Sequence, residues 1–164
     1  MTYNKEAIRS RAIDYSSQGI VITDPNLPDQ PMVDVNKAFE AMTGYDRDEL
    51  LGRNCRFLQG PDRIQPARKS LRDSIDNLED KTVVLKNYRK DGTMFWNRLT
   101  VSAVYDDDGK LIYFVGVQQD ITAQQNQHAY LVKTNEQLDR VEAKLDEREK
   151  LIVALKLELA NKKA

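Results

Sequence analysis

The chain has 164 residues, which suits one domain of ordinary size with an appendage. Its single cysteine and single histidine exclude an internal disulfide and a metal site built from several thiolates or imidazoles. Its 25 Lys and Arg residues balance 26 Asp and Glu residues, so charge gives no reason to expect nucleic acid or an anionic membrane as a partner. No apolar run reaches the roughly 20 residues of a membrane span, and the first residues lack the apolar core of a signal peptide, which predicts a cytoplasmic protein.

Residues 5–13 predict a short amphipathic helix near the N-terminus, with Ile8, Ala12 and Ile13 on one face. We expect this helix to cap the domain or to join a dimer interface, and packing on the domain's own sheet is the alternative. Residues 1–15 are therefore assigned to an N-terminal cap helix.

Short elements with clear start and stop signals follow. Apolar and β-branched runs predict strands, an Asn or Asp before a helix and a Gly after it mark helix ends, and a Pro favours the first helical turn. Strands are predicted at 20–23 and 32–35. A helix capped by Asn36 and ended by Gly44 follows, and then a short helical turn capped by Asp46 and stopped by Gly52. A further helix begins at Pro66 and carries Ala67, Leu71 and Ile75 on one face.

Three longer strands are predicted at residues 82–89, 93–105 and 111–119. The dipeptide Asp-Gly lies between neighbouring strands twice, and it is typical of hairpin turns. Two short strands, a group of helices and three antiparallel strands predict an α+β domain, with a five-stranded antiparallel sheet and short helices on one side of it.

The last 42 residues, 123–164, contain no Gly, no Pro and one aromatic residue, so the turn-forming residues end where a long helix can begin. Apolar residues recur there every seven positions, which predicts about four heptads of coiled coil in a helix about 60 Å long. The first series is Leu131, Leu138, Leu145, Ile152 and Leu159, and the second is Thr134, Val141, Arg148 and Leu155. Because such a helix is longer than one small domain, we expect a homodimer through this segment rather than a helix packed on its own domain.

Few residues of this sequence can carry chemistry, and Cys55 is the most informative of them. A lone cysteine is most often a small buried hydrophobe, but the neighbours of this one are polar. Arg56 offers a planar fork suited to a phosphate, while Asn54 and Gln59 offer paired donors and acceptors for the edge of a heteroaromatic ring. A catalytic pair of Cys55 with His128 is disfavoured, because His128 belongs to the C-terminal helix.

The run Gly-Arg-Asn-Cys-Arg-Phe-Leu-Gln at residues 52–59 resembles the photoactive signature of the LOV (light-oxygen-voltage) family, a flavin-binding branch of the PAS domains. Every fixed position of the family pattern Gly-x-Asn-Cys-Arg-Phe-Leu-Gln is matched. Asn87, Asn97 and Gln118 fall where the family keeps the amides that contact the flavin. The resemblance covers residues 16–122 and implies a PAS-type sheet in this segment.

The resemblance also implies a blue-light photoreceptor. Cys55 would be the thiol that bonds reversibly to flavin carbon C4a, and Gln118 the amide beside N5 that relays the change through the last strand to the C-terminal helix. The implied cofactor-binding residues are Asn54, Arg56, Gln59, Arg72, Asn87, Asn97 and Gln118, with apolar walls of Val21, Leu58, Ile75, Leu99 and Phe114. Arg72 is alternatively a solvated surface residue, and the apolar residues are alternatively ordinary core. The ordinary length of the loop before Pro66 favours FMN over FAD.

Three functions remain open on the sequence alone. The first is the photoreceptor, the second is a flavin-based PAS redox or ligand sensor that forms no bond to Cys55, and the third is a structural dimerisation module. Nothing besides the flavin site could organise a substrate, so we expect no enzymatic activity. No kinase, cyclase or helix-turn-helix pattern follows the helix, so the signal would pass to a separate effector protein or to an effector domain in a longer natural chain.

Overall fold

The computed structural model describes residues 4–161, except for the side chains of residues 159 and 160. The chain divides into two compact units, Met1–Thr122 and Ala123–Ala164. Within the described part of the first unit, five strands form one antiparallel sheet in the order β2-β1-β5-β4-β3. The predicted α+β architecture, a five-stranded antiparallel sheet with short helices, is confirmed.

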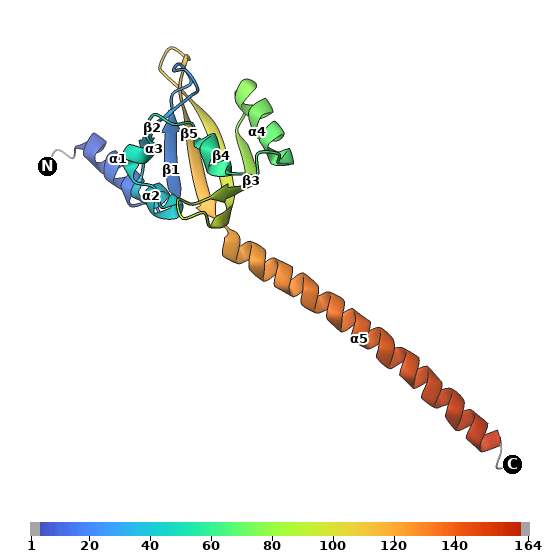
Figure 1. Cartoon of the computed structure of the whole chain (residues 1–164). Helices are drawn as coiled ribbons and strands as arrows, with labels where there is room; N and C mark the ends of the chain where they lie inside the picture. The colour runs from blue at the N-terminus through green and yellow to red at the C-terminus, as the bar shows by residue number, and fades with distance from the viewer. Residues whose placement is uncertain (1–3, 162–164) are drawn as a thin grey trace. The chain divides into compact units, whose positions relative to one another are not determined.

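The strands begin and end within one residue of the predicted positions. They are β1 (Gly19–Thr23), β2 (Met32–Val35), β3 (Lys81–Tyr88), β4 (Met94–Tyr105) and β5 (Leu111–Asp120), shown in Figure 1. Gly92 and Gly109 have φ angles of 84° and 77° in the turns that join β3 to β4 and β4 to β5. Only glycine adopts such angles without steric cost, which explains why the two Asp-Gly pairs marked the turns correctly.

The short helices are α1 (Lys5–Asp14), α2 (Lys37–Thr43), α3 (Arg47–Leu50), the 3₁₀ helix η1 (Cys55–Gln59) and α4 (Pro66–Asp76). Helices α2, α3 and α4 begin at the predicted signals and α1 lies where its apolar pattern predicts a helix, whereas η1 was not predicted from the sequence. The Asn36 side chain accepts a hydrogen bond from the backbone N–H of Phe39 at 3.0 Å, which caps α2, and Gly44 ends this helix with a φ of 76°. Asp46 and Glu49 form a capping box around α3.

Helix α1 is present where the sequence predicts it, but none of its residues is buried. Ile8 and Ile13, two of the apolar residues on its predicted face, are 52% and 37% exposed. A hydrogen bond of 2.9 Å from the Asn36 side chain to the carbonyl of Ile13 connects the end of α1 to the domain. The structure therefore does not show α1 packed on the sheet, and its role as a cap or as part of a dimer interface stays a prediction.

The core of the domain gathers where α2, α3 and η1 meet strands β1 and β2. Its buried cluster consists of Val21, Met32, Val35, Phe39, Leu50 and Leu58. Burial of a large apolar side chain stabilises the fold by about 1.5–3 kcal/mol, so these six residues hold the helices in place. Helix α2 packs against β1, whereas η1 and α4 pack against β3, which forms one edge of the sheet (Figure 1).

Helix α5, Thr122–Asn161, begins at the last residue of the first unit and supplies the described part of the second. The apolar residues of its two heptad series are about half exposed: Leu131, Leu138, Val141, Leu145, Ile152 and Leu155. Leu159, the last residue of the first series, lies outside the described side chains. No helix within residues 4–161 is both long enough and apolar enough to cross a bilayer.

Candidate functional site

A cavity of about 420 Å³ lies against one face of the sheet. This volume is in the range of pockets that hold small organic cofactors. All of the side chains that the sequence predicts for the site line this one cavity: Val21, Asn54, Cys55, Arg56, Leu58, Gln59, Arg72, Ile75, Asn87, Asn97, Leu99, Phe114 and Gln118. The structure thus brings together residues from β1, η1, α4, β3, β4 and β5.

Three buried amides from adjacent strands form one polar end of the cavity. Asn87 on β3, Asn97 on β4 and Gln118 on β5 are each at most 4% exposed. Asn97 Nδ2 donates to Asn87 Oδ1 at 2.8 Å and to Gln118 Oε1 at 2.6 Å. The side chains meet because alternate residues of antiparallel neighbours project from the same face of a sheet.

One atom of this amide cluster lacks a hydrogen-bond partner. Asn97 Oδ1 is buried and has no partner in the part of the chain that the structure describes. Leaving a buried acceptor unpaired costs about 1–3 kcal/mol, so an unpaired atom in a ligand-sized cavity indicates a ligand that donates to it. The cluster as a whole offers both donors and acceptors, as the edge of a heteroaromatic ring requires.

The reactive thiol candidate, Cys55, is the first residue of η1. The Asn54 side chain caps this helix by accepting from the backbone N–H of Arg56 at 2.9 Å. Leu58 and Gln59 are buried, while Cys55 is partly buried and lines the cavity. Burial raises the pKa of the Cys55 thiol to about 12, so the sulfur carries its proton at neutral pH.

Several residues that line the cavity were not predicted from the sequence. They are Thr23, Asp29, Gln30, Arg68, Leu71, Asp76, Leu85, Val101 and Gly116. Most of them share a face with a predicted residue: Arg68 and Asp76 lie one helical turn from Arg72 on α4, and Leu85 lies two residues before Asn87 on β3. Helical and strand periodicity could therefore have found them. Asp29 and Gln30 have no such signal, because they lie in the loop between β1 and β2.

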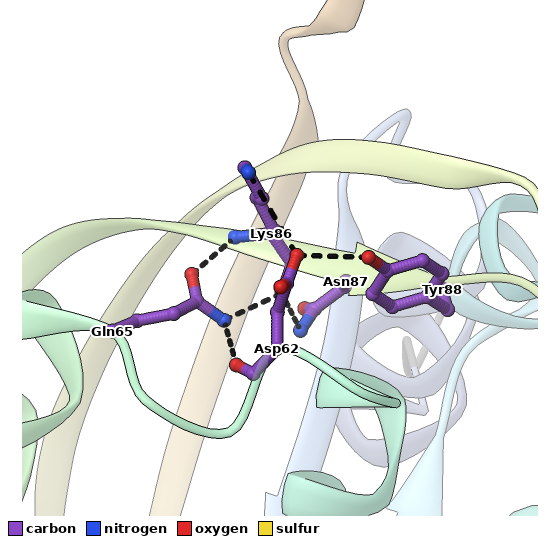
Figure 2. Close-up of polar contacts among 5 residues, drawn as sticks. All are labelled: Asp62, Gln65, Lys86, Asn87 and Tyr88. Atoms are coloured by element: carbon purple, nitrogen blue, oxygen red, sulfur yellow. Dashed lines mark hydrogen bonds and ion pairs between the residues drawn. The ribbon is translucent and has the colours of Figure 1, made fainter.

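The loop between η1 and α4 is fastened to the edge strand β3, as Figure 2 shows. Gln65 Oε1 accepts from the backbone N–H of Lys86 at 2.8 Å, and Gln65 Nε2 donates to the Lys86 carbonyl at 3.0 Å and to the Asp62 carbonyl at 2.8 Å. The Gln65 amide thus pairs with backbone groups that an edge strand otherwise leaves free. Asn87 Nδ2 donates to the same Lys86 carbonyl at 2.9 Å, which links this loop to the amide cluster.

Tyr88 strengthens the same attachment. Its hydroxyl donates to the Asp62 carboxylate at 2.8 Å, and this hydrogen bond raises the pKa of Tyr88. The Tyr88 ring lies against Gly60, where a Cβ atom would be 2.7 Å from the ring. Gly60 also has a φ of 51°, so a larger residue there would meet both backbone strain and a clash.

We expect the substitution Gln65→Ala to lower the free energy of unfolding by about 1–3 kcal/mol, because it leaves the backbone N–H of Lys86 without its partner and removes one of the two side-chain donors to the Lys86 carbonyl. Hydrogen exchange of the Lys86 amide should accelerate at the same time. Gln18→Ala is the matched control, since Gln18 is exposed and its side chain makes no hydrogen bond within the described residues. Denaturant unfolding and exchange of both variants test the prediction, and equal stability would contradict it.

The described residues include no cluster of three or more His, Cys, Asp or Glu side chains that could hold a metal ion. The polar groups of the cavity are instead one thiol, one threonine hydroxyl, amides, arginines and two carboxylates. Such a set suits an organic ligand with a polar ring edge and an anionic group.

Comparison with known proteins places this chain and its fold in a family. Residues 17–123 match the model of the PAS domain. A blue-light photoreceptor of Listeria monocytogenes serovar 1/2a is 44% identical over 132 residues, which are 80% of this chain and 51% of that protein. The chain therefore spans about half the length of this curated relative.

Two solved structures extend the likeness to three dimensions. The light-state structure of the Aureochrome1 LOV domain is 42% identical with a TM-score of 0.63, and the match covers 77% of this chain and 96% of that one. An RNA-binding light-oxygen-voltage receptor is 34% identical with a TM-score of 0.74, over 83% of this chain and 40% of that one. The shared fold agrees with the resemblance seen in the sequence. The chain belongs to the PAS family and, within it, is a LOV domain followed by a long C-terminal helix.

Proposed function

We propose that the protein is a blue-light photoreceptor that binds a flavin, with FMN as the cofactor. The observation that carries the proposal is the cavity on the sheet, which has the only thiol of the chain, three buried amides and a group of arginines in its lining. The Listeria relative is named a blue-light photoreceptor, which supports the same function. The proposed output is a change in helix geometry rather than catalysis.

The residues of the cavity fit a flavin at its two ends. Asn87, Asn97 and Gln118 would bind the polar edge of the ring, and the unpaired Asn97 Oδ1 is an acceptor for a ring N–H. Arg56 and Arg72 would hold a phosphate, and Arg68, one turn from Arg72, lies in the same cavity. Asn54 and Gln59 also line it.

Between these ends the cavity offers apolar walls. The proposed walls are Val21, Leu58, Ile75, Leu99 and Phe114. Gly116 keeps room for a ring, because a Cβ atom at this position would lie 2.8 Å from Val21 Cγ1 and 3.4 Å from Leu99 Cδ1. A side chain larger than glycine would thus push into the cavity between β1 and β4.

A bound flavin would supply light absorption and an electron-poor ring carbon, and the protein would supply the thiol and its position. In the proposed step the S–H bond of Cys55 breaks, its sulfur bonds to flavin C4a and the proton goes to N5, and the reverse step in darkness restores both partners. Because burial keeps the Cys55 thiol protonated, the proton that N5 needs can come from the same side chain.

We propose that Gln118 relays this change to α5. Its amide can rotate to offer its oxygen to a newly protonated nitrogen, and it lies two residues before the end of β5. Past that end, the backbone N–H of Ile121 donates to the Trp96 carbonyl at 2.8 Å, and the backbone N–H of Trp96 donates to Thr122 Oγ1 at 2.9 Å. A shift of β5 against β4 would therefore act on Thr122, the first residue of α5.

The proposal includes a homodimer formed through α5. The apolar heptad positions of this helix are about half exposed in the single chain, and a second copy would bury them. A separate effector protein, or an effector domain in a longer natural chain, would read the resulting helix geometry.

An absorption spectrum tests the proposal directly. The purified protein should be yellow, and blue light should bleach the visible flavin band, which then returns in darkness. A flavin band that does not bleach reversibly would favour a redox or ligand sensor, and a colourless protein that takes up no added flavin would contradict flavin binding altogether.

The pKa of Cys55 gives a pH prediction. Since this pKa is raised to about 12, the fraction of thiol is constant over the whole neutral range. The quantum yield of bleaching, taken from the initial slope under weak light, should therefore be flat from about pH 6 to about pH 9. A yield that rises with pH around the ordinary cysteine pKa of about 8.5 would mean that the thiolate is the reacting form, and would contradict the prediction.

A further inference from the structure

We propose that Asp29 sets how strongly the site discriminates between phosphorylated and unphosphorylated flavin, by placing a carboxylate on the arginine that would hold the phosphate. This inference rests on the proposed flavin binding. Asp29 lies in the loop between β1 and β2 and lines the same cavity as Arg56.

The two side chains form a direct ion pair. Arg56 Nη1 donates to Asp29 Oδ1 at 2.5 Å, and both side chains are more than half exposed. An exposed ion pair of this kind adds little to the stability of a protein, so a phosphate can compete for the same guanidinium at little cost. The guanidinium of Arg56 can therefore donate to the Asp29 carboxylate, to a phosphate, or to both at once.

The position of Asp29 is fixed by its backbone. Asp29 and the next residue, Gln30, have φ angles of 67° and 48°, which lie in the left-handed region that other residues than glycine seldom adopt. Asn54 Nδ2 holds this conformation by donating to the Asp29 carbonyl at 2.6 Å and to the Gln30 carbonyl at 3.3 Å. The Oδ1 of the same Asn54 side chain accepts from the backbone N–H of Arg56. Asn54 thus positions both members of the ion pair.

Charge then gives the direction of the effect. The arginines 56, 68 and 72 attract an anion into the cavity, whereas Asp29 and Asp76 repel it. A phosphate monoester carries nearly two negative charges at neutral pH. When such a phosphate and one carboxylate lie about 6 Å apart in water, their repulsion weakens binding about tenfold. Riboflavin has the same ring system without the phosphate, so it escapes this repulsion.

The test compares two ligands on two variants. Protein freed of flavin is titrated with FMN and with riboflavin, and binding is followed by flavin fluorescence. Asp29→Asn removes the charge, keeps the shape and suits the left-handed backbone. Asp34→Asn is the matched control, because Asp34 forms a similar exposed pair of 2.7 Å with Arg47 and does not line the cavity.

We expect Asp29→Asn to lower the Kd for FMN about tenfold at low salt and to change the Kd for riboflavin less than twofold. The gain should shrink at about 1 M salt, where charges are screened within about 3 Å. Asp34→Asn should change neither Kd. Thermal unfolding of the flavin-free variants shows whether each is folded.

Two results would overturn the inference while leaving flavin binding intact. Equal changes for FMN and riboflavin, including no change for either, would show that Asp29 does not sense the phosphate. Weaker FMN binding by Asp29→Asn would show that Asp29 orients Arg56 for the phosphate. If the parent protein binds neither flavin, the proposed function itself fails, and the inference falls with it.

Discussion

Replacing Cys55 with alanine is expected to leave the flavin bound and to abolish the reversible bleach completely. Cys55 is the only cysteine of the chain, so no other thiol of the same molecule can take its place. The side chain that is removed is small, and the amides, arginines and apolar walls of the cavity are unchanged, so FMN affinity should change less than about tenfold. The variant should also stay fluorescent under light that bleaches the parent.

The measurement is a visible spectrum before, during and after a saturating blue pulse, with flavin content taken from the dark spectrum. Thr23→Ala serves as the matched control, because Thr23 is another small residue that lines the cavity, from β1, and it carries no thiol. This control should bleach and recover like the parent. A bleach that persists in Cys55→Ala and returns in darkness would assign the chemistry to another group and refute the proposed role of Cys55.

Local signals predicted the fold well because its elements begin and end at residues with a physical reason to be there. Asn36 and Gly44 limit α2 through a side-chain cap and a left-handed backbone, and both are visible in the sequence. The glycines of the two hairpins do the same for the long strands. Helix α1 shows the limit of this reasoning, since its apolar residues predict a packed face while Ile8 remains exposed. Periodicity indicates a surface that can be buried, but not what buries it.

The lining of the cavity was predictable where the family resemblance pointed to its residues, and much less so where loops contribute. The family signature pointed to η1, and alternation along β4 and β5 brings Asn97 and Gln118 to one face. Asp29 and Gln65 had no local signal. Their roles depend on partners 27 and 21 residues away, Arg56 and Lys86, and so on how the loops lie in the folded domain.

Gln118→Leu is expected to separate photochemistry from output. Leucine is similar in size to glutamine but cannot accept a hydrogen bond from a protonated ring nitrogen. The variant should therefore still bleach, because Cys55 is untouched, while the light-dependent change in α5 is lost. Small-angle scattering in darkness and under blue light measures that change, and the scattering mass shows at the same time whether two chains pair.

Gln119→Leu is the matched control for Gln118→Leu. Gln119 is the next residue of β5, so its side chain points to the opposite face of the sheet, where Arg98 Nη1 donates to its Oε1 at 3.4 Å. Both substitutions remove one amide from the same strand, but only Gln118 reaches the cavity. If the light-dependent change survives in Gln118→Leu, or vanishes equally in both variants, the signal does not pass through the Gln118 amide, and the continuity of β5 with Thr122 would have to act without it.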